Sequence, residues 1–116
     1  MKISFFKKKD KYKKLSLRDE KDFNAILDFI EKHKNVNLYR LSKNPIKESF
    51  EDIEKDSLEL NCPAYFVNKR LFINNYSFDL SGSILKDSEI QVYLGERLII
   101  KLPRGYKGDF VYYSIE

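Results

Sequence analysis

The chain has 116 residues, of which 34% are charged and 42% are hydrophobic, and its formal net charge is +4. This length predicts one domain, over residues 1–116, with room for a hydrophobic core. A single cysteine, Cys62, excludes an internal disulfide. No apolar run approaches the roughly 18 residues that a membrane span needs, so we expect a cytoplasmic protein without membrane contact.

The positive charge is concentrated at the start of the chain. Residues 1–14 hold seven lysines and one aspartate, whereas the remaining residues hold 15 basic and 17 acidic side chains. We expect Ile3–Phe6 to be an edge strand. It is followed either by a loop over residues 7–14 or by a hairpin with Tyr12–Leu17 as the return strand. Three interpretations stay open: a solvated surface, a patch that contacts phosphates, or contact with a membrane surface or an acidic partner. The candidate phosphate contacts are Lys7, Lys8, Lys9 and Lys11.

Residues 16–34 carry the pattern of an amphipathic helix. Phe23, Ile26 and Ile30 recur at the spacing of one helical face. Ser16 is the expected N-cap, acids occupy the early turns and cations the last turn, as the helix dipole favours. Residues 36–41 follow and are expected to form a strand.

A second helix is predicted from Asn44, as N-cap, with Pro45 in its first turn. Ile46, Phe50 and Ile53 would form its buried face. From residue 44 to residue 60 the chain has six acids and two lysines, which makes this the most negative stretch outside residues 1–14. The exposed acids of interest are Glu48, Glu51, Asp52 and Asp56.

The C-terminal half is rich in aromatic and β-branched residues and predicts short antiparallel strands. Asn68 suits the positive φ of a tight hairpin turn, Gly95 favours a two-residue type II′ turn, and Pro103 should end a strand. The expected fold is therefore α+β: a mostly antiparallel sheet of five to seven strands, with two helices of the N-terminal half packed on it. The predicted strands are 65–67, 70–73, 76–80, 89–94, 97–102 and 110–115.

The residues that carry chemistry are few. One histidine, His33, and one cysteine cannot form a Cys/His metal cluster, and the four glycines match no phosphate-binding loop. A nucleophilic pair of Cys62 and His33 is formally open, but ordinary roles at a helix end and an apolar turn explain both residues better. We therefore predict no catalytic residue, no metal and no cofactor.

The remaining features favour a binding protein. Eight tyrosines exceed what alternating strands can bury, and exposed tyrosine favours protein interfaces. An acidic surface suits a basic partner. The predicted partner-binding residues are Glu48, Glu51, Asp52, Asp56, Tyr106 and Tyr112. The sequence does not indicate an oligomeric state.

In its size, its composition and its lack of a catalytic motif, the chain resembles the small cytoplasmic immunity proteins that bacteria pair with secreted toxins. These include the immunity proteins of contact-dependent inhibition systems. The resemblance implies a non-enzymatic inhibitor whose partner is a cognate toxin, for instance a nuclease. The alternative is a nucleic-acid-associated accessory protein that binds phosphates through its lysine-rich N-terminus.

Overall fold

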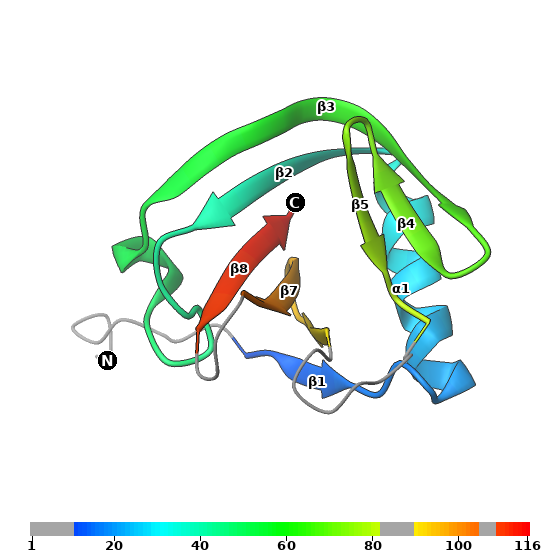
Figure 1. The fold of residues 1–116 in the computed structure, drawn as a ribbon, viewed down its shortest axis with the longest axis horizontal. Coiled ribbons are helices and arrows are strands. Elements are labelled where there is room, and N and C mark those ends of the chain that lie inside the picture. Colours follow the sequence, from blue (N-terminus) through cyan, green and yellow to red (C-terminus); the bar gives the residue numbers. More distant parts are fainter. Residues whose placement is uncertain (1–10, 82–89, 105–108) are drawn as a thin grey trace, which may run out of the picture.

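The computed structural model describes residues 11–81, 90–104 and 109–116. Within these residues the chain forms one α-helix and an eight-stranded antiparallel sheet (Figure 1). The predicted α+β class and antiparallel sheet are confirmed, but eight strands replace the predicted five to seven, and one helix replaces two. The elements are β1 (Lys13–Leu15), α1 (Glu20–His33), β2 (Asn35–Leu41), β3 (Lys55–Val67), β4 (Arg70–Ile73), β5 (Tyr76–Asp79), β6 (Gln91–Leu94), β7 (Leu98–Pro103) and β8 (Phe110–Ile115).

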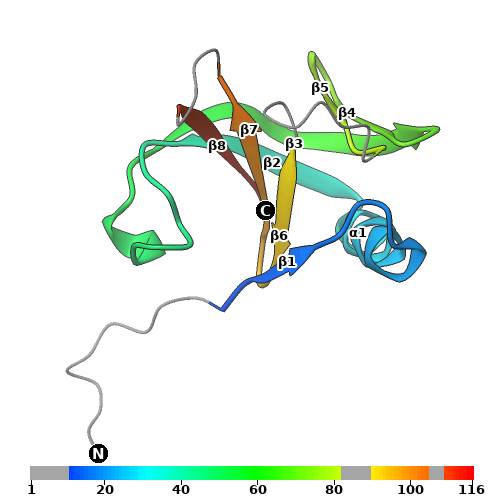
Figure 2. The same ribbon diagram turned by 60° about the horizontal axis from the view of Figure 1, so that its bottom comes forward.

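The strands lie in the order β1-β6-β7-β8-β2-β3-β4-β5. The meanders β3–β4–β5 and β6–β7–β8 are joined by β2, which pairs with β8 on one side and β3 on the other. β3 is 13 residues long and connects the two halves: its first part pairs with β2 and its last four residues pair with β4. Figures 1 and 2 show the resulting sheet as strongly curved, with β3 as a long arc along it.

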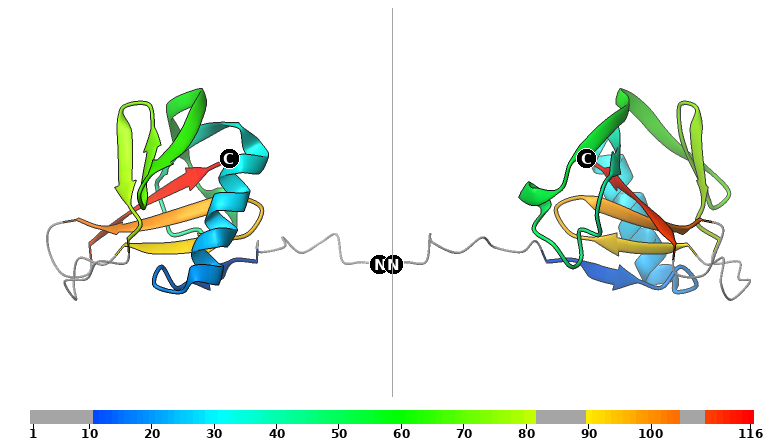
Figure 3. Two further views of the ribbon diagram at one scale, coloured as in Figure 1. Left: turned by 90° about the vertical axis from the view of Figure 1, so that its right-hand side faces the viewer. Right: turned by 60° about the vertical axis from the view of Figure 1, so that its left-hand side comes forward.

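The main core lies between α1 and one face of the sheet, which we call the inner face. The helix buries the residues that the 3.6-residue period predicted, among them Phe23, Ile26 and Ile30. Val36 and Leu71 from the sheet are fully buried in the same cluster. Each such side chain contributes roughly 1.5–3 kcal/mol when it leaves water. Figure 3 shows how the helix runs across the strands.

The helix cap lies three residues later than the predicted Ser16 cap. Its N-cap is Asp19, whose carboxylate accepts a hydrogen bond of 2.9 Å from the Lys21 backbone N–H. The backbone N–H of Ser16 instead donates to the side chain of Asp22 at 2.8 Å. Both residue types can cap a helix, so sequence preference alone does not choose between them.

A smaller cluster occupies the opposite, outer face of the sheet. Leu41, Ile53 and Ile99 are buried there. Period-two alternation explains this second core, because Ile99 lies between Leu98 and Ile100, which both face α1. Four aromatic residues pack against the cluster: Tyr12, Phe50, Tyr93 and Tyr112.

The predicted second helix is wrong. Asn44 does cap a turn, since its side chain accepts a hydrogen bond of 2.9 Å from the Ile46 backbone N–H. The chain then becomes extended at Ser49 and makes only a 3-10 turn over Phe50–Asp52 before β3 begins. The Phe50 ring is held on the outer face, with the Arg97 guanidinium 3.7 Å from its centroid. Contacts of the Phe50 ring with the sheet stabilise this conformation more than a short helix would be stabilised, because that helix would place the like charges of Glu48 and Asp52 four residues apart.

The tight turns follow the sequence only in part. Asn68 has a φ of 56° between β3 and β4, as predicted, and Pro103 is the last residue of β7. The two-residue turn predicted at Gly95 is wrong, because Leu94 pairs with Leu98 and leaves three residues in the loop. Glycine is needed there for space: an added Cβ would collide with the Lys11 carbonyl oxygen and contact the Tyr12 ring at 3.0 Å.

Candidate partner-binding surfaces

The acidic residues predicted to bind a partner do not form one helical face. Glu48, Glu51 and Asp52 are all exposed and lie at or beside the 3-10 turn. Glu48 lies 3.9 Å from the Lys43 ammonium group. Tyr112 pairs with Leu41, whereas Asp56 pairs with the preceding residue of β2, Arg40. Neighbouring residues on one strand point to opposite faces of the sheet, so Tyr112 and Asp56 lie on opposite faces.

The structure describes only some of the predicted phosphate-contacting lysines and partner-binding tyrosines. Lys11 is exposed at the entry to β1, and Tyr112 is half-buried against the outer-face cluster. The predicted strand Ile3–Phe6 lies outside the described residues. So do three lysines and one tyrosine of the predicted contacts: Lys7, Lys8, Lys9 and Tyr106.

The structure adds a group of cations on the outer face, which we call the Lys101 cluster: Lys14, Lys47 and Lys101. The pKa of Lys101 is lowered, first by partial burial and then by the positive charges of Lys14 and Lys47. Its ammonium group lies 4.0 Å from the centroid of the Phe110 ring. These lysines come from three separate segments of the chain, so no local sequence pattern predicted their proximity.

Exposed apolar surface lies on the last part of β3 and on β4, apart from Leu60, which is 57% exposed earlier on β3. We call it the β3–β4 patch: Tyr65, Val67 and Phe72. Tyr65 and Val67 have exposed fractions of 55% and 53%. Tyr65 pairs with Phe72 across the strands, and their rings stack with centroids 5.4 Å apart and planes 15° apart.

Alternation explains why this patch faces away from the helix. Ala64 and Phe66 pack against the inner core, and the Phe66 ring meets Phe23 of α1 edge to face at 5.5 Å. Tyr65 and Val67 therefore point outward. The apolar run over residues 64–67 indicates this exposed surface in the sequence. Such a strand is apolar on both faces, and when a helix covers only one face, the other face stays exposed.

Cys62 and His33 are engaged separately. The Cys62 thiol lies 3.7 Å from a Glu59 carboxylate oxygen, and the His33 Nδ1 lies 2.7 Å from the Phe29 carbonyl oxygen. Burial, followed by the Glu59 charge and hydrogen bond, raises the pKa of the Cys62 thiol. A thiol whose pKa is raised has less of the reactive thiolate at neutral pH.

Across residues 11–81, 90–104 and 109–116, no group of three or more His, Cys, Asp or Glu side chains is placed to hold a metal ion. The one helix found in this part of the chain is too short and too polar to cross a bilayer. The chain matches no protein-family model, no curated protein and no solved structure.

Proposed function

We propose that this protein is a non-enzymatic inhibitor that binds another protein, in the manner of the immunity proteins that bacteria pair with secreted toxins. The observation that carries the proposal is the β3–β4 patch. Two neighbouring outward positions of β3 leave more than half of a tyrosine and a valine side chain in water. An aromatic ring on β4 extends this surface.

The composition of the patch and its border suits a protein interface. Aromatic residues and arginine are enriched at the centres of such interfaces, and polar groups surround them. Lys69, Arg70 and Asp79 border the patch and line, with Phe72, a shallow cavity of about 360 Å³. Covering apolar surface contributes roughly 25 cal/mol per Å², so a partner that packs on these side chains gains affinity from them.

The acidic turn provides a second contact in this proposal. Glu51 and Asp52 are exposed and lie at the opposite end of β3 from the patch. Negative charges at an interface mainly increase the rate of association with a basic partner. A toxin that acts on nucleic acid has such a basic surface, because it must hold phosphates.

The test is capture of the partner from the native host, using the tagged full-length protein, followed by identification of the captured chain. The double variant Tyr65→Ser/Phe72→Ser should lose the partner. Both side chains lie outside the buried clusters, so thermal unfolding should move by only a few degrees, as expected for about 1 kcal/mol.

The matched comparison is the double variant Glu51→Lys/Asp52→Lys. It should still capture the partner but associate more slowly, most clearly at low salt. If the Tyr65/Phe72 variant captures the partner as well as the native protein does, the patch is not the interface. If no protein is captured and only nucleic acid returns, the inhibitor proposal is wrong.

A second candidate function is favoured by the Lys101 cluster. The positive charges of Lys14 and Lys47 disfavour the charged form of Lys101, and a bound phosphate backbone would relieve this repulsion. The cluster includes Lys14 of β1, which is the last lysine of the lysine-rich start of the chain. The second candidate is therefore a nucleic-acid-associated accessory protein.

A further inference from the structure

A pocket opens where β2 leaves β8. The last residue of β2, Leu41, pairs with Tyr112, and the chain then turns as the Ser42 backbone N–H donates to the Glu54 carbonyl oxygen at 2.9 Å. β8 extends beyond this point through Val111 and Phe110, which pair only with β7. The space left beside them is a cavity of about 290 Å³.

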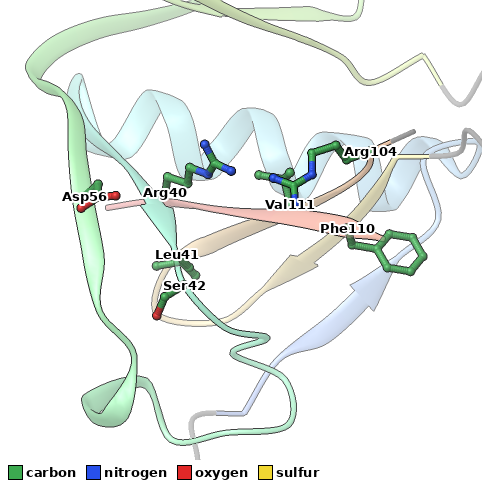
Figure 4. Close-up of a pocket in the computed structure, with 7 residues that line it drawn as sticks. All are labelled: Arg40, Leu41, Ser42, Asp56, Arg104, Phe110 and Val111. Carbon is green, nitrogen blue, oxygen red and sulfur yellow. The ribbon is translucent and has the colours of Figure 1, made fainter. Parts of the chain in front are cut away.

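Two arginines reach into this pocket from different strands. Arg40 belongs to β2, and Arg104 directly follows β7. Figure 4 shows the two side chains pointing toward one another above Val111. Leu41, Val111 and Phe110 also border the pocket, and Figure 4 shows the Phe110 ring pointing away from the two arginines.

The partners of the two guanidinium groups differ. Arg104 is held by Asp109, since its Nε and Nη2 donate to the two carboxylate oxygens at 3.2 and 3.4 Å. This pairing leaves the Nη1 donors of Arg104 for a ligand. Arg40 turns away from Asp56, its cross-strand neighbour, and within the described ranges no carboxylate lies within 4.0 Å of its guanidinium group (Figure 4).

We propose that this pocket binds an oxyanion group, a phosphate monoester or a carboxylate, carried on an apolar body that lies against Val111. Two facing guanidinium groups repel unless an anion lies between them, and planar guanidinium donors match both oxyanions in geometry. Asp56 borders the pocket and opposes the negative charge of the ligand. This proposal does not depend on the inhibitor function.

The experiment follows the arginine side-chain Nε–H signals by NMR while phenyl phosphate or benzoate is titrated into the full chain at millimolar concentrations. Saturable shifts of Arg40 and Arg104 are expected. Arg40→Gln should weaken binding about tenfold, as the loss of a charge-assisted hydrogen bond predicts. Asp56→Asn should strengthen binding. The control Arg18→Gln removes the same charge from the exposed segment before α1, outside the pocket, and should bind like the native protein.

Tighter binding of phenyl phosphate would identify a phosphate ligand, and tighter binding of benzoate a carboxylate; either result supports the oxyanion site. Shifts that do not saturate with either probe, or equal affinity in Arg40→Gln and the native protein, would overturn it. If Arg40→Gln fails to fold, Arg104→Gln tests the site independently, because either substitution should weaken binding of the probe.

Discussion

Cys62 illustrates how one residue takes its chemistry from its neighbours. It lies on β3 opposite Val36, partly covered, with its thiol directed to Glu59. Glu59 also accepts a hydrogen bond of 2.7 Å from the Asn74 side chain, which holds the carboxylate in place. The negative charge beside the thiol therefore follows from the fold, because Asn74 lies in the β4–β5 turn.

The first prediction concerns the reactivity of this thiol. Glu59→Gln removes the negative charge but keeps an oxygen acceptor for Asn74, so the raised pKa of Cys62 should fall. Iodoacetamide should then alkylate Cys62 faster than in the native protein at the same mildly alkaline pH. Glu20→Gln, a matched charge loss at the start of α1, should leave the rate unchanged.

The same pKa shift has a consequence for stability. A thiol whose pKa is higher in the folded state favours folding while it is protonated. This contribution is present below the ordinary pKa of cysteine and is lost as the pH rises through the raised value. In Glu59→Gln, unfolding followed against pH should show a smaller loss of stability over this alkaline range. An alkylation rate equal to that of the native protein would contradict the assigned role of Glu59.

At the scale of elements, the segment between β2 and β3 is where local pattern and tertiary structure disagree. The spacing of Ile46, Phe50 and Ile53 is helical, yet the segment forms isolated turns. Ile53 is 7% exposed in the outer-face cluster, and Phe50 lies against Arg97 and Lys55. Nucleating a short helix is unfavourable, so anchoring of these side chains on the sheet decides the conformation.

A prediction follows for the two isoleucines of this segment. Ile53→Ala should lower the free energy of unfolding by about 3 kcal/mol, because it leaves a cavity between Leu41 and Ile99. Ile46→Ala should cost about 1 kcal/mol, because this side chain is only partly buried. Urea denaturation measures both values. Equal losses would indicate that the two residues share one buried helical face after all.

For the whole molecule, the distribution of charge matters more than the total of +4. The Lys101 cluster joins Lys14 of β1 and Lys101 of β7 with Lys47 from the segment between β2 and β3, and the lysine-rich N-terminal sequence enters the fold at β1. The β3–β4 patch lies at the other end of the strand order. The two candidate functions therefore use separate surfaces and can be tested separately.

The corresponding prediction concerns salt. If three lysines neutralise phosphates, the affinity for a labelled single-stranded oligonucleotide should fall about 20-fold between roughly 50 and 200 mM salt. Lys101→Gln should reduce the slope of log affinity against log salt by about 0.7. Fluorescence anisotropy measures both effects. Lys69→Gln removes a lysine outside the cluster and serves as the control for Lys101→Gln. Deletion of residues 1–10 leaves β1 intact and measures the contribution of the N-terminal lysines to the affinity.

An affinity that does not change with salt, or a Lys101→Gln variant with the native slope, would contradict this second candidate function. The inhibitor proposal predicts that Lys101→Gln leaves capture of the protein partner intact. Loss of capture in that variant, with retention in the Tyr65/Phe72 variant, would move the protein interface from the patch to the outer face.

The sequence by itself determined α1, the strands of the C-terminal half and the Asn68 turn, because periodicity and turn preference are local properties of the chain. It also excluded a Cys/His metal cluster, since one cysteine and one histidine are too few. Only the tertiary structure decided the conformation of residues 44–53, the extension of β3 back to Lys55, and the placement of Arg40 and Arg104 at one pocket. In each case the deciding contacts join residues distant in sequence, and their free energy exceeds the weak preferences of a short segment.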